Sequence, residues 1–212
     1  MSGSRLFAIS DIHGHVEGLR LLLKQAGYRP GQDALVLLGD YIDADPATYA
    51  ALRDIRELVA EGAVALAGNM ECALLERCSR DDGGEELVSK AMLQFAKALP
   101  LYHRQGGYVF VHAGLRPGVP LERQLPRDLI GIREEFWMTP YAGEEPVVFG
   151  HTPTRRIGAA PGELWLGAGM IGIDTGAKHG LRLTLVELHG RMAYSCGTGH
   201  GNRYSDYRCV TW

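Results

Sequence analysis

The chain has 212 residues, of which 46% are hydrophobic, which is enough for one sizeable core but short for two domains, so we expect a single domain over residues 1–212. The net charge of −3 gives no general attraction to nucleic acid or to an anionic membrane, and neither is an expected partner. Residues 1–5 carry no apolar signal region, and the four cysteines form no Cys-x-x-Cys pair, so we expect a cytoplasmic protein with reduced thiols.

The first predicted strand covers residues 6–9, four apolar residues in a row. Asp11 and His13 fall just past its C-terminal end, and Gly14 allows a tight turn before an apolar-periodic helix over residues 16–26. Open α/β folds usually place their sites at such strand ends, although an Asp-x-His triplet by itself more often only begins a helix.

The same order, an apolar strand followed by ligand-type residues near a glycine, recurs four more times. These strands are predicted over residues 34–38, 63–67, 108–111 and 147–149. The donors that follow the five strands mix carboxylate, imidazole and amide groups, which suits Mn, Fe or Zn better than the all-oxygen cages of calcium. Asp40, in the middle of the series, is a carboxylate that can bridge two cations at close range. The predicted metal ligands are Asp11, His13, Asp40, Asn69, His112 and His151.

Helices are predicted between these strands. Asp45 followed by Pro46 is typical of a helix start, and this helix extends to about residue 61, so Asp45 is interpreted as a cap and not as a ligand. A helix from residue 71 toward residue 78 follows. A polar loop over residues 79–84 separates it from a second amphipathic helix over residues 85–99.

The later part of the chain turns to strands, predicted over residues 171–174, 181–188 and 191–196, with a short hairpin turn at His189-Gly190. The segment 115–126, with three prolines, is either a plain connection or a loop that faces the substrate. The tail 197–212 has no apolar period of its own, so it either packs back on the domain or is mobile. The order of elements predicts a four-layer α/β/β/α sandwich with the metals at the strand ends.

Five short motifs resemble, in this order, those of the calcineurin-like metallophosphoesterases: Asp-Ile-His-Gly, Gly-Asp-Tyr-x-Asp, Gly-Asn-x-Glu, His-Ala-Gly-Leu and Gly-His-Thr-Pro. The likeness spans residues 11–153 and extends to the segment 173–177. Within the family, the chain is most similar to the phosphoprotein phosphatase branch, especially its short bacterial members and the related diadenosine tetraphosphate hydrolases. The resemblance implies a dinuclear metal site, with a helical cap over about residues 71–99 beside it.

The resemblance also implies roles for single residues. Arg133 is similar to the arginine that clamps the substrate phosphate, with Asn69 as a second phosphate contact. The other interpretation of Arg133 is an exposed helix residue beside Glu134 and Glu135. The implied metal assignment is Asp11 and His13 on the first ion, Asn69, His112 and His151 on the second, and Asp40 between the two.

Two positions depart from the family pattern. Ala44 stands where Gly-Asp-x-x-Asp-Arg-Gly has a phosphate-binding arginine, and Met70 stands where Gly-Asn-His-Glu has the histidine that protonates the leaving group. A thioether cannot donate a proton at any pH. Asp43, which orients that histidine in relatives, remains a predicted catalytic residue but is expected to lack its partner. His15 and His179 are the candidates to supply the proton instead.

We therefore expect a phosphatase that uses two divalent ions, Mn first and Fe or Zn as alternatives, and that hydrolyses phosphate monoesters of a phosphoprotein or small molecule by attack of a hydroxide held between the metals. A missing acid costs about 10²–10⁴-fold, which is tolerable when a phenolate or a phosphate leaves but not when an alkoxide does. The alternatives are hydrolysis of a dinucleoside polyphosphate, and a phosphate-binding protein of the same fold that has lost turnover.

Overall fold

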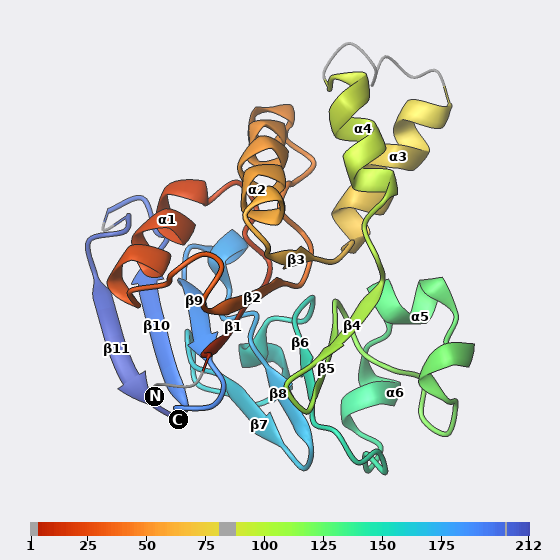
Figure 1. Ribbon diagram of the computed structural model, residues 1–212. Helices are drawn as coiled ribbons and strands as arrows, with labels where there is room; N and C mark the ends of the chain where they lie inside the picture. The colour runs from red at the N-terminus through yellow and green to blue at the C-terminus, as the bar shows by residue number, and fades with distance from the viewer. Residues whose placement is uncertain (1–3, 81–87, 202) are drawn as a thin grey trace.

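The computed structural model describes residues 4–80, 88–201 and 203–212, whose strands form two sheets (Figure 1). The first sheet contains β1 (Leu6–Ile9), β2 (Ala34–Leu37), β3 (Val64–Ala65), β9 (Arg182–Glu187), β10 (Met192–Gly197) and β11 (Tyr207–Thr211). The second sheet contains β4 (Tyr102–Gln105), β5 (Tyr108–Val111), β6 (Val147–Phe149), β7 (Trp165–Gly167) and β8 (Met170–Gly172).

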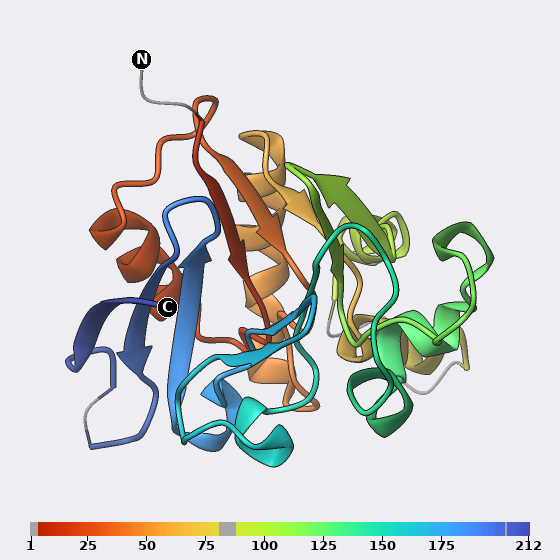
Figure 2. The same ribbon diagram turned by 90° about the horizontal axis from the view of Figure 1, so that it is seen from below.

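In the first sheet the strands lie in the order β11-β10-β9-β1-β2-β3. β1 and β2 are parallel, with Leu6 opposite Ala34, and β2 and β3 are parallel as well. On the other side β9 is antiparallel to β1, and β10 and β11 continue the antiparallel half, which Figure 2 shows in blue beside the red β1. Since β1, β2 and β3 run in one direction, the loops that leave them meet at one edge of the sheet.

The second sheet has the order β4-β5-β6-β8-β7. Its three central strands, β5, β6 and β8, are parallel to one another, whereas the edge strands β4 and β7 are antiparallel to their neighbours. His112 follows β5 directly, and Gly150 separates β6 from His151. The parallel register therefore places these two histidines beside each other at the strand ends.

The helices are α1 (Val16–Gln25), α2 (Ala51–Ala60), α3 (Asn69–Ser79), α4 (Lys90–Lys97), α5 (Pro126–Gly131) and α6 (Glu134–Trp137). α1 and α2 cover the outer face of the first sheet, and α5 and α6 lie outside the second, while α3 and α4 stand together at one end of the molecule (Figure 1). Within the described residues, no helix has the length and apolar character that crossing a membrane requires.

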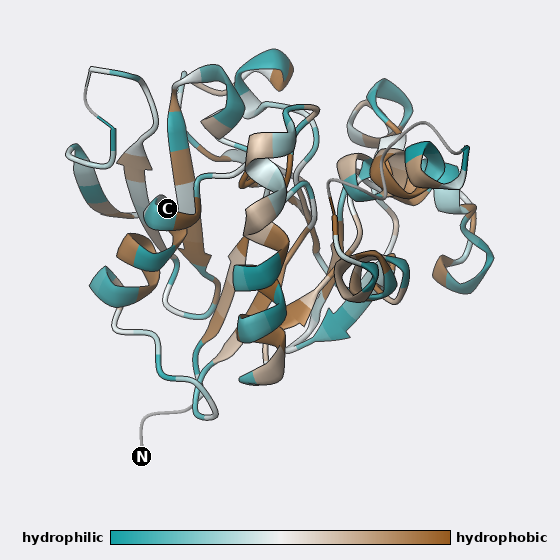
Figure 3. Cartoon of the chain, turned by 90° about the horizontal axis from the view of Figure 1, so that it is seen from above, coloured by the Kyte–Doolittle hydropathy of each residue, from teal (hydrophilic) through white to brown (hydrophobic). Residues whose placement is uncertain are grey.

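The core is divided into three apolar layers. Alternate residues of β1 serve two of them: Phe7 and Ile9 face the layer under α1 and α2, and Leu6 and Ala8 face the layer between the sheets. Phe110 of β5 enters the layer between the sheets from the other side, and its neighbour Val109 enters the third layer, under α5 and α6. Figure 3 shows that the central strands are largely apolar, in brown. The predicted α/β/β/α sandwich is confirmed.

Some boundaries differ from the prediction. The helix expected from Pro46 starts as a 3₁₀ helix, Pro46–Ala50, before α2, and the Asp45 carboxylate accepts a hydrogen bond from the Ala47 N–H (2.9 Å), which confirms Asp45 as a cap. The second helix of the pair starts at Lys90, where the Ser89 side chain caps it. The first residues predicted for that helix, 85–87, lie outside the described residues.

The tail packs back on the domain, which is one of the two alternatives expected for it. Its last residues form β11, which is antiparallel to β10, with Met192 opposite Thr211 and Cys196 opposite Tyr207. All five side chains of β11 are exposed. An edge strand exposed in this way shows no apolar alternation, which is why its sequence did not predict a strand.

Candidate metal centre

The loops after β1 and β2 hold three of the predicted ligands in one place. Asp11, His13 and Asp40 all have left-handed backbones, with φ of 53°, 45° and 53°. Such backbones are uncommon for non-glycine residues and tend to gather at functional sites. The two loops are joined by hydrogen bonds from the Asp11 N–H to the Gly39 carbonyl (3.1 Å) and from the His13 N–H to the Asp40 carbonyl (2.9 Å).

One group of ligand-type atoms consists of Asp11, His13 and Asp40. The Nε2 atom of His13 lies 3.7 Å from a carboxylate oxygen of Asp11 and 3.8 Å from one of Asp40. The other ring nitrogen, Nδ1, lies 3.1 Å from the Ile42 carbonyl, to which it can donate a hydrogen bond. That bond turns Nε2 toward the two carboxylates, as in many metal-binding histidines.

A second group consists of Asp40, His112 and His151, with Asn69 beside it. The Nε2 atom of His112 lies 3.4 Å from Asp40 and 3.0 Å from the Asn69 side-chain oxygen, while its Nδ1 can donate to the Leu38 carbonyl (2.8 Å). The rings of His112 and His151 are 5.1 Å apart. Within each group, one ligand atom per residue lies within 4.8 Å of the others, and Asp40 belongs to both groups. The structure thus brings all six predicted ligands together, with Asp40 between the two halves.

The buried carboxylates carry more negative charge than the protein around them compensates. Burial and the neighbouring charges of Asp11 and Glu71 raise the pKa of Asp40 well above its usual range, and burial with Asp11 does the same for Asp174. Burial acts in the same direction on Asp11, but hydrogen bonding to His13 and the charges of the nearby histidines lower the pKa of Asp11 overall. Carboxylates packed in this way fit a bound cation, which would stabilise their charged forms.

Glu71 is a structural residue of the site that the sequence did not single out. Its side chain is fully buried, and its carboxylate accepts hydrogen bonds from the backbone N–H groups of Asp40, Tyr41 and Gly68, each at 2.9 Å. It therefore clamps the Asp40 loop to the start of α3. The available signal was its position three residues after Gly68, which is the spacing of a capping box.

Gly68 is required at this junction for steric reasons. A Cβ atom at Gly68 would lie 2.3 Å from a carboxylate oxygen of Asp40, closer than any real contact. The chain can therefore approach the bridging carboxylate only without a side chain here. This explains the glycine before Asn69 in the motif.

Except for His112, which is completely buried, the six predicted ligands line a cavity of about 170 Å³. Arg133 lies at its wall, directly before α6, and donates a hydrogen bond from its guanidinium to the Thr152 hydroxyl (3.3 Å). Met70 also lines the cavity, so the position of the missing acid faces the ligands. The other lining residues are Asp11, His13, Asp40, Asn69, His151, Pro153, Arg156, Asp174, Lys178 and His179.

Asp43 has a partner, contrary to the sequence-based expectation. Its carboxylate lies 2.7 Å from the Nζ atom of Lys178, and the same oxygen accepts from the Ala44 N–H (2.7 Å). Its other oxygen is 3.9 Å from Nδ1 of His13. Burial would raise the pKa of Asp43, but the hydrogen bond from Lys178 lowers it overall. Asp43 is therefore an ionised residue that joins the metal loop to the segment carrying Lys178.

His15 does not line the cavity, and the structure does not place it as the proton donor. Its Nδ1 atom lies 2.8 Å from the Tyr204 hydroxyl, on the side of α1 that meets the C-terminal segment. Burial and the charges of Arg203 and His13 lower the pKa of His15 to about 4. His179, the other candidate, does line the cavity, and partial burial with the charges of Arg155 and Arg156 lowers its pKa.

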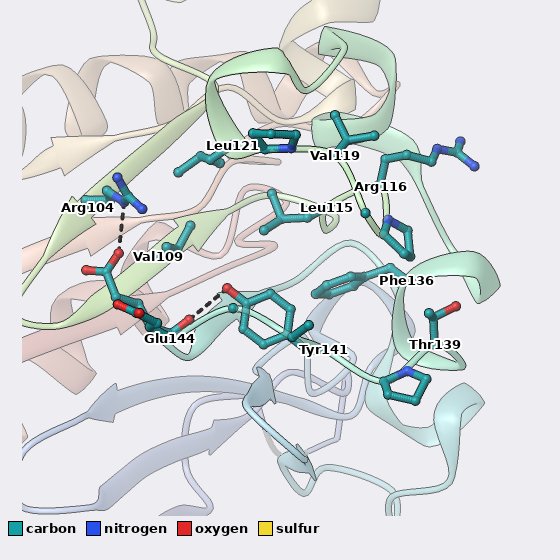
Figure 4. A pocket seen from close by; sticks show the side chains of 17 residues that line it. Arg104, Val109, Leu115, Arg116, Val119, Leu121, Phe136, Thr139, Tyr141 and Glu144 are labelled. Atoms are coloured by element: carbon teal, nitrogen blue, oxygen red, sulfur yellow. Dashed lines mark hydrogen bonds and ion pairs between the residues drawn. The ribbon is translucent and has the colours of Figure 1, made fainter.

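A larger pocket of about 470 Å³ lies elsewhere, between β4, β5 and the loops that follow β5 and α6 (Figure 4). Leu115, Phe136 and Tyr141 point into it, and Arg104 spans one end to Glu145 (2.9 Å). None of the six predicted ligands lines it. The proline-containing segment 115–126 contributes to this pocket and not to the metal cavity, so it does not face the predicted ligands.

Known proteins resemble this chain both in sequence and in structure. The model of the calcineurin-like phosphoesterase family matches residues 4–171. The symmetrical bis(5'-nucleosyl)-tetraphosphatase of Aromatoleum aromaticum is 34% identical over 137 residues, covering 58% of this chain and 50% of the relative. That of Methylococcus capsulatus is 32% identical over 132 residues, covering 58% and 47%. The chain thus spans about half the length of the curated relatives it matches.

Solved structures are similar over nearly the whole chain. A crystal structure assigned as a diadenosine tetraphosphatase has a TM-score of 0.80 and 25% identity, covering 94% of this chain and 96% of that one. The cold-active protein-tyrosine phosphatase of a psychrophilic Shewanella has a TM-score of 0.64 and 15% identity, covering 99% and 81%. The second likeness shows the shared fold alone.

Proposed function

Because the chain belongs to the calcineurin-like phosphoesterase family, a group of metal-dependent hydrolases, we propose that it hydrolyses the anhydride bonds of a dinucleoside polyphosphate. The observation that carries the proposal is Met70, which faces the ligand cluster at the position of the usual proton donor. A leaving group that is itself a phosphate departs as an anion and needs no proton, whereas a serine or threonine alkoxide does.

The comparisons support this substrate class over the phosphate monoesters that the sequence first suggested. Both relatives described above are named as symmetrical bis(5'-nucleosyl)-tetraphosphatases. The solved structure with a TM-score of 0.80 is assigned as a diadenosine tetraphosphatase. The protein-tyrosine phosphatase has only 15% sequence identity to this chain, so its similarity supports a shared fold and not a shared substrate. The monoester reaction therefore takes second place.

We propose that the six clustered residues hold two divalent cations, with manganese as the first choice. Mixed carboxylate, imidazole and amide donors around a shared Asp40 fit a pair of borderline ions. When bound, such ions lower the pKa of a water molecule and polarise phosphate oxygens. The protein's own part is to hold the ligand rings: the carbonyls of Ile42 and Leu38 orient His13 and His112. Nε2 of His13 is thereby turned toward Asp11 and Asp40, and Nε2 of His112 toward Asp40 and Asn69.

Arg133 is proposed to bind the phosphate under attack. Arg133 lines the same cavity as the carboxylates and its guanidinium donates to Thr152, so it can offer two parallel N–H donors to phosphate oxygens. Asn69, whose oxygen faces His112, is proposed as a metal ligand whose amide group lies beside the same phosphate.

We also propose that residues 1–212 form one domain, and that α3 and α4 form a helical cap beside the metal site.

The test is manganese-dependent product release from three substrates: diadenosine tetraphosphate, an aryl phosphate and a phosphoserine peptide. We expect the dinucleotide to be hydrolysed most efficiently and the peptide least. The Asp40→Asn variant, which removes the shared carboxylate, is the control and should be inactive on all three. Hydrolysis of the phosphoserine peptide as fast as the dinucleotide would contradict the proposal.

A second candidate, phosphate binding without turnover, is favoured by the joint loss of the arginine at Ala44 and the histidine at Met70. It predicts that the purified protein binds phosphate in the presence of manganese but hydrolyses none of the three substrates. Turnover gained only in the Ala44→Arg/Met70→His double variant would establish that reading.

A further inference from the structure

Lys178 occupies a distinctive place in the candidate site. It lines the cavity together with Met70, and its ammonium group contacts Asp43, the residue next to Ala44. It therefore brings a positive charge to the cavity that Met70 lines and to the carboxylate that accepts from the Ala44 N–H. Asp43, expected to have lost its histidine, instead holds a lysine from a segment 135 residues away.

The segment that carries Lys178 is firmly anchored. Lys178 lies in a one-turn 3₁₀ helix, Ala177–His179, between two glycines with left-handed backbones. The Thr198 hydroxyl donates to the Ala177 carbonyl (2.9 Å), and the Asp174 carboxylate accepts from the Gly176 N–H (3.0 Å). Ala177 itself is buried, while the Lys178 side chain is 41% exposed. The lysine thus has a fixed base and a head that can reach a ligand in the cavity.

Asp43 is equally well held on the other side. Its backbone N–H donates to the Thr48 hydroxyl (2.8 Å), and that hydroxyl donates to the Asp45 carbonyl (2.6 Å). Its carboxylate is only 24% exposed. The ion pair therefore joins two ordered segments instead of two freely moving surface side chains, although exposure of the lysine keeps the pair weak enough to exchange with a ligand.

We propose that Lys178, positioned by Asp43, binds the leaving phosphate and neutralises the charge that develops on it, in place of the missing proton donor. This inference rests on the proposed hydrolysis of a polyphosphate. The water oxygen forms the new bond to phosphorus while the bridging P–O bond breaks, and its electron pair stays with the leaving nucleotide. The protons of the water end on the product phosphate and in solvent, and Lys178 keeps its own three.

The chemistry favours the leaving group over the phosphate under attack as the partner of Lys178. Arg133 already serves the attacked phosphate in the proposed site, which leaves Lys178 available for the leaving group. An ammonium is a compact point charge suited to a phosphate anion, and charge neutralisation suffices for a leaving group that is stable as an anion. It cannot substitute for proton transfer to an alkoxide, which gives the site a preference for polyphosphates.

The test compares the manganese-loaded parent with Lys178→Met, which keeps the length of the side chain but removes its charge. Substrates are diadenosine tetraphosphate and a series of aryl phosphates with progressively poorer leaving groups. We expect kcat on the dinucleotide to fall about 10- to 100-fold, and the dependence of the rate on leaving-group pKa to become steeper. Lys178→Arg should restore most of the loss. Lys24→Met, at an exposed position in the last turn of α1, is the matched control.

A binding measurement gives a readout independent of turnover. The affinity of the protein for ADP should fall more in Lys178→Met than its affinity for inorganic phosphate, because the nucleotide is the departing group. Asp43→Asn should lower kcat in the parent but have little further effect in the Lys178→Met background, since the proposal gives Asp43 the role of positioning the lysine. Thermal melting checks that each variant is folded.

The outcomes separate this inference from the proposed function. A parent that hydrolyses the dinucleotide, with Lys178→Met equal to it, overturns the role of Lys178 alone. A uniform loss over all aryl phosphates, with phosphate affinity reduced as much as ADP affinity, also overturns it, because Lys178 would then bind the attacked phosphate. A folded parent without manganese-dependent hydrolysis of any substrate overturns the proposed function and this inference together.

Discussion

Met70 has two contributions to the site that can be separated. Its backbone N–H donates a hydrogen bond to Asp40 (2.9 Å), whereas its side chain lines the cavity. The first contribution survives any substitution except proline, so the shape of the Asp40 loop does not depend on the thioether. The identity of the side chain therefore affects chemistry more than structure.

We predict that Met70→His raises the rate on alkyl phosphates such as a phosphoserine peptide by about 10²-fold, because a positioned acid supplies about that much. The rate on a dinucleoside polyphosphate should change much less, since its leaving group needs no proton. Steady-state rates on both substrates provide the measurement. Met138→His, at a methionine that is 75% exposed, is the control and should alter neither rate. An equal gain on both substrates would contradict the explanation.

Glu71 gives a prediction about stability. Glu71→Gln would turn a carboxylate that accepts from four backbone N–H groups, those of Asp40, Tyr41, Ile42 and Gly68, into an amide whose NH₂ group faces some of those donors. We expect the free energy of unfolding to fall by about 1–3 kcal/mol and the affinity for Mn²⁺ to fall with it. Urea unfolding and calorimetric titration measure the two effects. Glu76→Gln, at an exposed residue of the same helix, should leave both unchanged.

At the scale of elements, β11 depends on one buried side chain. Arg182 on β9 is 5% exposed and donates to the Asp206 carboxylate and carbonyl, both at 2.6 Å, and to Ser195 on β10. These contacts secure the turn just before β11. An edge strand buries little of its own surface, so β11 gains little stability from apolar side chains. The contacts of Arg182 stabilise it instead.

Arg182→Met should therefore loosen β11 without unfolding the rest of the sheet. We expect hydrogen exchange of the backbone amides of Tyr207–Thr211 to become much faster, while β9 and β10 stay protected. Mass spectrometry of exchanged peptides resolves these segments. Arg208→Met, which removes an exposed partner of Asp206 at 3.2 Å, is the control. Unchanged exchange in Arg182→Met would show that strand pairing alone holds the tail.

At the scale of the whole molecule, the candidate metal centre joins both sheets. Asp11, His13 and Asp40 come from loops of the first sheet, and His112 and His151 come from loops of the second. Asn69 begins α3, one of the two helices that stand together at the end of the molecule. A cation held by these residues would therefore add to the hydrogen bonds, such as those from His112 to the Leu38 carbonyl and from the His151 N–H to Asp11, that already join these segments.

We predict that Mn²⁺ raises the melting temperature, by an amount that grows with pH. At about 100 times the dissociation constant, binding adds about 2.7 kcal/mol, or about 5–10 °C for a chain of this size. Burial would lower the pKa of His13, but its hydrogen bond to Asp11 and the charges of Asp11 and Asp40 raise it overall. Protonated His13 thus persists to higher pH than usual and competes with the metal.

The pH dependence of stability that His13 causes can be measured on the metal-free protein. A raised pKa stabilises the metal-free fold below the ordinary histidine pKa, and this contribution is lost as pH rises through the raised value. The difference between melts with and without Mn²⁺ should therefore widen from about pH 6 to about pH 8.5. His13→Ala should abolish most of the widening. A shift that is constant with pH would contradict this role of His13.

The sequence alone was sufficient for the sandwich and for the identity of the clustered residues. Each depends on local patterns: four-residue apolar strands, a glycine after most of them, and a polar residue at the strand end. Because parallel neighbouring strands end at the same edge, strand ends predicted separately along the chain become one site. That is why Asp11 could be grouped with Asp40, and His112 with His151, before their positions were known, whereas the order of the motifs, which resembles that of the family, joined the two pairs across the two sheets.

Only the tertiary structure decided which side chains meet without a local pattern. The Lys178–Asp43 pair, the contact of His15 with Tyr204 and the hydrogen bonds from the Asp40 and Tyr41 N–H groups to Glu71 each join segments at least 30 residues apart. The polar edge strand β4 and the exposed β11 were missed for a related reason, since pairing with a neighbouring strand, and not burial of their own side chains, makes them strands. The spacing of apolar residues shows which side of one segment is buried. These contacts depend instead on how two separate segments pack against each other.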